Sequence, residues 1–249
     1  MDIKNIPEHE LARLREKAKE LSGSTTDYQS EYSSLLTRRV NHEPLQYIEE
    51  YVPFYSISLK VDERCLIPRP ETEYLVQIIK DNIESPKKVL DVGTGSGCIA
   101  LMMKSIFPNS EVTGIDISED AIELANENSK LNSLEVSFFQ SNLLENVKET
   151  DHDLIVANLP YIPTENLNEL DREVIDYEPL TALNGGKDGL EIISNLIHQL
   201  EEKDYMKVNL FLEIDSRKSS ETLELLNSWD EVKLLEDLAE KDRYVFAKR

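Results

Sequence analysis

The sequence predicts an α/β fold with a mostly parallel β-sheet of seven strands. From residue 87 onward, short apolar and β-branched runs alternate with segments of helical periodicity, which is typical of βαβ units. A glycine-rich turn follows the first of these runs, and the last two runs follow one another without a helix between them. The second feature predicts an antiparallel hairpin at one end of the sheet.

Residues before this α/β part predict a smaller helical unit and a linker. A first helix is expected over residues 8–21, where apolar side chains recur on one face, and a second helix is expected after a cap at Thr25 or Thr26. An aromatic and β-branched stretch then predicts a β-hairpin. The expected division is a helical unit over residues 1–42, a hairpin linker over 43–66 and a main domain over 67–249.

The elements of the α/β part follow in order along the chain. The runs that predict strands are buried, short and bounded by turn residues. The predicted strands are 87–93, 111–116, 135–140, 153–158, 207–214, 232–239 and 243–249. The predicted helices between them are 98–107, 118–131, 188–202 and 216–229.

Composition and charge exclude several classes of function. The chain has 249 residues and a net charge of -22, so sequence-independent binding to the phosphate backbone of nucleic acid is not expected. Cys65 and Cys98 are far apart, and the four histidines are scattered, which predicts neither a metal site nor a disulfide framework. No apolar run approaches membrane-spanning length and the first residues lack a signal-peptide core, so we expect a cytoplasmic protein without membrane contact.

The turn "LDVGTGSGCIAL" is the first candidate binding site. Gly93, Gly95 and Gly97 allow positive φ and close approach of a ligand, and ligands of open α/β sheets bind at the carboxyl ends of the strands. Asp116 ends the next strand, where a carboxylate can accept two ribose hydroxyls. Asp91, directly before the turn, suits a methionyl ammonium better than a pyrophosphate. The turn therefore favours S-adenosylmethionine over a dinucleotide.

The run "LIVANLPY" is the second candidate site. By itself it is typical of a strand that ends in a turn, but its strand should lie beside the first one, so Asn158 would face the same pocket. The Asn158 oxygen and the Leu159 carbonyl can accept the two N–H groups of a planar amine or amide. Pro160 restricts the local backbone, and Tyr161 can stack on the planar group. These residues predict a clamp for a nitrogen in front of a sulfonium methyl.

Several stretches in order resemble the release factor glutamine methyltransferases, the peptide chain release factor N5-glutamine methyltransferase family. They are "EPLQYI", "LIPRPETEYLV", "LDVGTGSGCIAL", "GIDIS", "NLPYIP", "YEPLTALNGGKDGLEIISNL", "LFLEI" and "DLAEKDRYVFAKR". The resemblance implies a class I, Rossmann-like fold that uses S-adenosylmethionine. It also implies that the methyl group goes to the glutamine amide nitrogen of the Gly-Gly-Gln motif in a release factor and that the N-terminal unit recognises this protein. Apart from the resemblance, we expect a monomer, and the net charge predicts no direct contact with nucleic acid.

The resemblance also assigns roles to residues, and Pro68–Glu73 would lie over the pocket. The implied cofactor residues are Asp91, Gly93, Thr94, Gly95, Ser96, Gly97, Asp116, Asn142, Leu143 and Asn158. The implied catalytic residues are Asn158, Leu159, Pro160 and Tyr161. The implied substrate-binding residues are these same four together with Arg69, Pro70 and Glu71.

The chain departs from the family pattern at three positions, and alternatives stay open. Leu159 replaces a proline of the usual Asn-Pro-Pro-Tyr, while Asp215 and Glu240 replace glycines. Since some adenine methylases of ribosomal RNA carry Asn-Leu-Pro-Tyr, the alternative function is methylation of an adenine amine in nucleic acid. A nicotinamide oxidoreductase is opposed by the GxGxG spacing, and a non-catalytic cofactor-binding module is opposed by the intact clamp.

Overall fold

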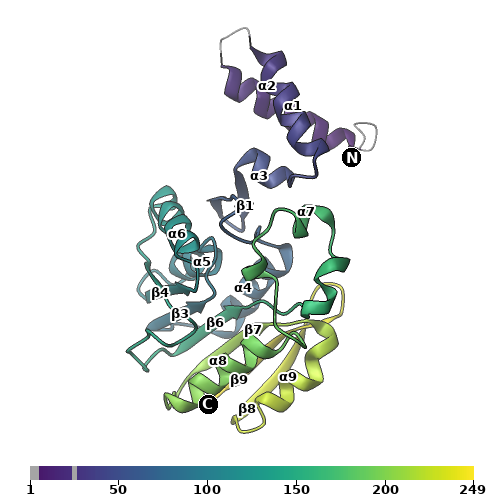
Figure 1. Ribbon diagram of the computed structural model, residues 1–249. Helices are drawn as coiled ribbons and strands as arrows, with labels where there is room; N and C mark the ends of the chain where they lie inside the picture. Colours follow the sequence, from purple (N-terminus) through teal and green to yellow (C-terminus); the bar gives the residue numbers. More distant parts are fainter. Residues whose placement is uncertain (1–5, 24–26) are drawn as a thin grey trace.

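The structure is a computed structural model that describes residues 6–23 and 27–249. A helical N-terminal unit stands apart from a broad α/β part in which one sheet lies between two layers of helices (Figure 1). The cap expected at Thr25 or Thr26 lies outside the described residues. Within them, no helix is both long and apolar enough to cross a bilayer.

The N-terminal unit contains α1 (Glu8–Ser22) and α2 (Tyr28–Val40), and α3 (Leu45–Glu49) packs against both. Its small apolar core consists of Leu14, Ala18, Leu35, Leu45 and Ile48. Ion pairs between α1 and the C-terminal end of α3 add to this packing, since Arg13 pairs with Glu49 and Lys17 pairs with Glu50. The unit therefore has a core of its own, as the periodicity of its sequence predicts.

The predicted hairpin is present but shorter than expected. It consists of β1 (Tyr51–Phe54) and β2 (Ile57–Lys60), which pair antiparallel. The preceding residues form α3 instead, because Leu45 and Ile48 lie three positions apart and are buried together on one helical face. Asn128 fastens the hairpin to the α/β part, accepting from the Lys60 N–H at 2.7 Å and donating to the Lys60 carbonyl at 3.0 Å.

Seven strands form one sheet within the described residues, as predicted. In spatial order they are β5 (Ser137–Gln140), β4 (Glu111–Asp116), β3 (Lys88–Val92), β6 (Leu154–Asn158), β7 (Asn209–Glu213), β9 (Asp242–Lys248) and β8 (Glu231–Glu236). All neighbours are parallel except β9, which is antiparallel to both β7 and β8. The order reverses at β3, so the carboxyl ends of β3 and β6 form the switch point where ligands of such sheets bind.

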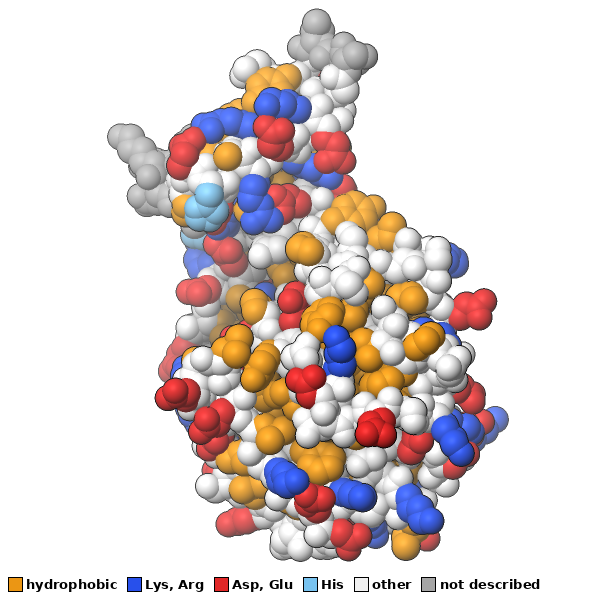
Figure 2. Space-filling view, turned by 180° about the vertical axis from the view of Figure 1, so that it is seen from behind, with side chains coloured by type: hydrophobic (Ala, Val, Ile, Leu, Met, Phe, Trp, Pro, Cys, Tyr) orange, Lys and Arg blue, Asp and Glu red, His pale blue; other side chains and the backbone are white. Residues whose placement is uncertain are grey.

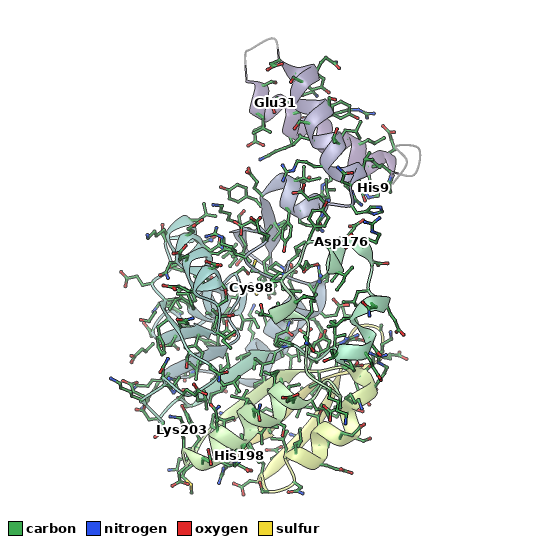
Figure 3. All side chains as sticks on the ribbon, viewed as in Figure 1. His9, Glu31, Cys98, Asp176, His198 and Lys203 are labelled. Carbon is green, nitrogen blue, oxygen red and sulfur yellow. The ribbon has the colours of Figure 1, made fainter. Side chains whose placement is uncertain are left out.

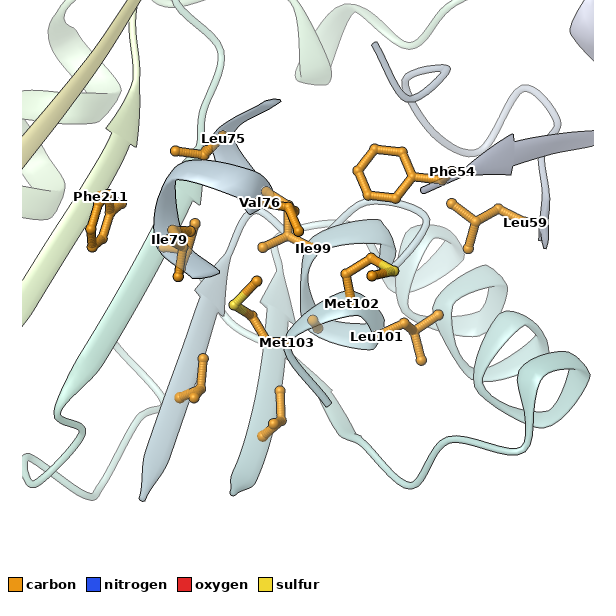
Figure 4. Close-up of a cluster of buried hydrophobic side chains, with 14 of the residues drawn as sticks. Phe54, Leu59, Leu75, Val76, Ile79, Ile99, Leu101, Met102, Met103 and Phe211 are labelled. Carbon is orange, nitrogen blue, oxygen red and sulfur yellow. The ribbon is translucent and has the colours of Figure 1, made fainter. Parts of the chain in front are cut away.

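Helices cover both faces of the sheet. One face packs against α4 (Pro70–Asn82), α5 (Cys98–Ile106) and α6 (Glu119–Asn132), and the other packs against α8 (Glu191–Glu202) and α9 (Ser219–Leu225). Figure 4 shows Leu75, Val76 and Ile79 of α4 beside Met102 and Met103 of α5 in the first layer. The sequence analysis did not predict α4, although its buried positions have helical spacing and proline occupies its first position.

The chain between β6 and α8 is a long connection with only short helices, which the sequence analysis did not predict. They are η2 (Thr164–Glu169), α7 (Arg172–Ile175) and η3 (Leu180–Ala182), while η4 (Ser216–Lys218) precedes α9. This connection reaches the N-terminal unit: the Tyr177 hydroxyl donates to the Asn41 carbonyl at 2.8 Å, and Arg39 pairs with Glu173 at 2.7 Å. Figure 3 shows Asp176, at the end of α7, close below this unit.

Candidate functional site

A cavity of about 420 Å³ lies at the carboxyl ends of β3, β4 and β6. This volume suits a small-molecule ligand. The predicted site residues on its wall are Gly93, Thr94, Gly95, Ser96, Asp116, Asn142, Leu143, Asn158, Leu159 and Pro160. The predicted residues that do not line it are Asp91, Gly97, Tyr161, Arg69, Pro70 and Glu71. Topology thus brings together most of what sequence reasoning selected.

The glycine-rich turn and Asp116 form one side of the cavity. Asp116 ends β4, and its carboxylate accepts hydrogen bonds from the backbone N–H groups of Gly95 and Ser118, both at 2.9 Å. Gly95 has φ +53, and a Cβ at this position would meet no atom within 4 Å, so the turn leaves open space there. Burial raises the pKa of Asp116. The carboxylate keeps further lone pairs that can accept hydroxyl groups of a ligand.

Asp91 lies beneath the turn and is fully buried. Its Oδ2 accepts from the Thr94 hydroxyl at 2.6 Å and from the Ala100 N–H at 3.1 Å, whereas Oδ1 has no hydrogen-bond partner among the described residues. Burial raises the pKa of Asp91 to about 7. A buried acceptor without a donor is costly, and a bound cation beside it would remove that cost. The contact predicted between Asp91 and an ammonium group stays a prediction.

Asn158 ends β6 at the cavity wall, and a chain of hydrogen bonds holds its side chain. Its Nδ2 donates to the Thr72 hydroxyl at 3.0 Å, and that hydroxyl donates to Glu213 at 2.9 Å. The Tyr161 hydroxyl donates to the other oxygen of Glu213 at 3.4 Å. Sequence reasoning placed Thr72 only within the stretch Pro68–Glu73 expected over the pocket, and it did not select Glu213. Their only signals were their places in the "PRPETE" and "LFLEI" stretches.

The backbone of the clamp rests on a glycine-containing loop. The Ile162 N–H donates to the Leu183 carbonyl at 3.1 Å, and the Gly185 N–H donates back to the Ile162 carbonyl at 2.8 Å. A Cβ at Gly185 would lie 2.7 Å from the Tyr161 Cα, closer than real Cβ atoms approach. Glycine at this position therefore permits the close contact that fixes the path of the chain after Tyr161.

The "PRPETE" stretch lies at the rim, and its members face different ways. Pro68 and Thr72 line the cavity, while Arg69 pairs with Glu178 at 2.5 Å. Glu178 also accepts from the Ile67 N–H at 3.1 Å, and burial raises its pKa. Arg69 thereby fastens this rim to the long connection. The predicted contact between Arg69 and substrate stays a prediction.

Other wall residues were not predicted as site residues, and Arg64 and Cys98 are two of them. Arg64 lines the cavity and pairs with Asp62 at 2.7 Å and with Glu127 at 2.9 Å, which lowers the pKa of Glu127 to about 2. Cys98, labelled in Figure 3, lines the cavity at the start of α5. Among the described residues, no group of three or more His, Cys, Asp or Glu side chains is placed to hold a metal ion.

Solved structures of methyltransferases have the same fold. A methyltransferase from Pyrococcus furiosus superposes with a TM-score of 0.59 at 19% identity, covering 87% of this chain and 98% of its own. The E. cuniculi Mtq2-Trm112 complex, described as responsible for methylation of the eRF1 translation termination factor, superposes with a TM-score of 0.54 at 20% identity, covering 75% and 99%. These likenesses establish the fold.

Sequence comparisons are more specific. The family described as Methyltransferase small domain matches residues 70–177. The release factor glutamine methyltransferase of Thermodesulfovibrio yellowstonii is 36% identical over 90% of this chain and 83% of its own length. The enzyme of the same name from Koribacter versatilis is 35% identical over 90% and 81%. The chain therefore belongs to the release factor glutamine methyltransferase family.

Proposed function

We propose that this protein transfers a methyl group from S-adenosylmethionine to the side-chain amide nitrogen of the glutamine in the Gly-Gly-Gln motif of a peptide chain release factor. The observation that carries the proposal is the orientation of Asn158, whose nitrogen is held by Thr72. Its oxygen, to which no described residue donates, is left as an acceptor at the cavity wall. An acceptor there matches an N–H donor, and the names of the relatives supply the glutamine.

The residues of the cavity fit the methyl donor. The glycine-rich turn would contact S-adenosylmethionine, Asp116 would accept its ribose hydroxyls, and Asn142 and Leu143 would border its adenine. Oδ1 of Asp91, which has no hydrogen-bond partner among the described residues and lies beneath the turn rather than on the cavity wall, supports an ammonium group nearby. When bound, S-adenosylmethionine supplies an electrophilic methyl group on a sulfonium.

The protein would contribute to the reaction by orienting the substrate nitrogen. An amide nitrogen is a weak nucleophile because its lone pair is delocalised into the carbonyl. The Asn158 oxygen and the Leu159 carbonyl would accept its two N–H groups and hold the nitrogen in line with the methyl group. The rate of such a reaction is sensitive to displacements of the reacting atoms of about 1 Å. Neither acceptor is a base, so their role is positioning rather than proton removal. Tyr161 completes the clamp from beside Glu213.

The proposed partner is the release factor itself, recognised as a folded protein. Residues 1–42 would provide the recognition unit, residues 43–66 the linker and residues 67–249 the catalytic domain. We further propose that the enzyme works as a monomer and without direct contact to nucleic acid. The net charge of -22 supports the last point, since it opposes binding to phosphate backbones.

A competition assay tests this function. Purified protein and labelled S-adenosylmethionine are incubated with a release factor and with adenine-containing RNA in the same reaction. We expect label in the release factor, none in the RNA, and none in a release factor whose Gly-Gly-Gln glutamine is replaced by asparagine. Label in the RNA would support the adenine-amine alternative instead.

A further inference from the structure

We infer that Thr72 and Glu213 are positioning residues for methyl transfer, which they serve by fixing the direction in which the Asn158 amide is presented. The inference rests on the proposed function and goes beyond it by naming the residues that decide which end of the Asn158 amide faces the substrate. Three elements meet at this point: the first turn of α4 supplies Thr72, the end of β6 supplies Asn158 and the end of β7 supplies Glu213.

The direction of the hydrogen bonds follows from the chemistry of the groups. An ionised carboxylate can only accept, so the single hydroxyl hydrogen of Thr72 is used in the 2.9 Å bond to Glu213. The Thr72 oxygen can then only accept from Asn158, at 3.0 Å, and only the NH₂ end of the amide can donate. The Asn158 oxygen must therefore point away from Thr72, which leaves it free to accept an N–H of substrate.

Glu213 also holds the other end of the clamp. Its Oε1 accepts from the Tyr161 hydroxyl, while its Oε2 serves Thr72. Asn158 and Glu213 lie opposite each other in the parallel pairing of β6 and β7, so the carboxylate is placed by the sheet itself. One buried carboxylate, 2% exposed, thus connects both side chains of the Asn-Leu-Pro-Tyr run that carry polar groups.

The charge state of Glu213 decides whether this direction is fixed. Burial raises its pKa to about 7, against the opposing hydrogen bond from Thr72 and the charge of Arg243. The charged and titratable groups around it are Glu71 from α4, Tyr161 after β6, and Arg243 and Tyr244 from β9, with Asp237 on Arg243. Protonated Glu213 could donate to Thr72, which could then donate to the Asn158 oxygen. The amide would present its nitrogen to the substrate, so the rate should rise with pH through about 7.

Asn158, Thr72 and Glu213 thus form a chain of hydrogen bonds, the relay, and substitutions at Thr72 test it with little change in side-chain shape. Thr72→Val removes both hydrogen bonds, and we expect kcat for release factor methylation to fall about tenfold to a hundredfold, with cofactor affinity changed less than about twofold. Thr72→Ser keeps the hydroxyl and should retain at least about half of the wild-type kcat. Thr222→Val is the matched control, because Thr222 is buried in α9 and its hydroxyl donates only to the Lys218 carbonyl.

The pH profile of kcat at saturating cofactor tests the role of Glu213. The wild type should lose activity as pH falls through about 7, whereas Glu213→Gln, which does not titrate, should give a flat profile at an intermediate rate. A Thr72→Val variant as active as Thr222→Val, or a Glu213→Gln variant that keeps the acid limb, would overturn the inference.

A readout without substrate separates this inference from the proposed function. The side-chain amide signals of Asn158 in ¹⁵N NMR, assigned by their absence in Asn158→Asp, should shift with pH through about 7 and should not shift in Glu213→Gln. If this titration is present but the wild type fails to methylate a release factor, the relay stands and the proposed function fails. If the signals do not titrate, the relay is wrong.

Discussion

The N-terminal unit and the α/β part of this protein are built on different physical principles. Residues 1–42 contain seven acidic and seven basic residues, so the whole charge of -22 lies in residues 43–249. Figure 2 shows both kinds of charged side chain interspersed on the narrow unit above the broad body. The unit has one small apolar cluster, completed by Leu45 and Ile48 of α3, whereas apolar clusters cover both faces of the sheet.

The contacts between the two regions are as instructive as their cores. Arg39 is 4% exposed and pairs with Glu10 at 2.6 Å inside the unit and with Glu173 at 2.7 Å across the boundary. Tyr177 adds a hydrogen bond to the Asn41 carbonyl. Apolar burial thus fixes the region with the cavity, while polar contacts of defined geometry orient the region proposed to select the partner. If the proposed roles of the two regions hold, substitutions should change the chemistry and the choice of partner separately.

The largest effect is expected at the clamp, within the rigid region. Asn158→Ala removes the acceptor that orients the substrate nitrogen, so kcat should fall by at least about 10²-fold. Thermal unfolding should change little, because Asn158 lies at the end of its strand. Single-turnover methyl transfer measures the rate, and full activity of this variant would contradict the clamp.

The next effect concerns the cofactor side of the same region. Asp116→Ala removes a charge-assisted acceptor for the ribose, at a cost of roughly 1.5–3 kcal/mol, or about tenfold to a hundredfold in affinity. Part of the loss comes from the turn, since Asp116 also accepts from the Gly95 N–H. Calorimetric titration with S-adenosylmethionine checks this value, and an unchanged affinity would count against the cofactor assignment.

A smaller and more selective effect is expected at the boundary. Arg39→Gln leaves Glu10 and Glu173 without their buried partner, so the unit should lose its fixed orientation. We expect kcat/KM for an intact release factor to fall about threefold to tenfold, with no change for a short Gly-Gly-Gln peptide. The neighbouring Arg38→Gln is the control, since Arg38 is half-exposed and its ion pair, with Glu43, is local. Equal losses on both substrates would show that the unit only supports folding.

The smallest effect is expected where the chain departs from its family. Leu159→Pro keeps the backbone carbonyl that the clamp uses, and the family motif has proline at this position. Activity should change by less than about threefold in a steady-state assay. A large loss would show that the Leu159 side chain, which lines the cavity, has a role of its own.

Local sequence signals predicted most of the regular elements of this structure, with α3 and α4 as exceptions, and left out the long-range contacts. The strands of the sheet and the glycine-rich turn have periodicity and composition that a short window reveals. The relay has no such signal, because Thr72 and Glu213 are 141 positions apart and Asn158 and Thr72 are 86 apart. The short helices of the connection after β6 were missed for a similar reason: the Arg39–Glu173 and Arg69–Glu178 pairs, rather than periodicity, hold this part of the chain.

The two replaced glycines show the same limit. Asp215 has φ -70, a conformation that any residue adopts, and it accepts from the Arg217 N–H at 2.9 Å. Glu240 has φ +58, so the turn between β8 and β9 keeps the left-handed conformation that glycine favours. The family pattern identified both positions, but only the backbone shows that Glu240, unlike Asp215, adopts a conformation that favours glycine.

Locating the transferred methyl group tests the central claim most directly. A release factor methylated by the wild-type protein is digested, and the peptide that contains Gly-Gly-Gln is fragmented in a mass spectrometer. The account predicts a single methyl on the side-chain amide nitrogen of that glutamine. A methyl on a lysine, an arginine or any other atom, or no modification of a folded release factor with cofactor present, would contradict it.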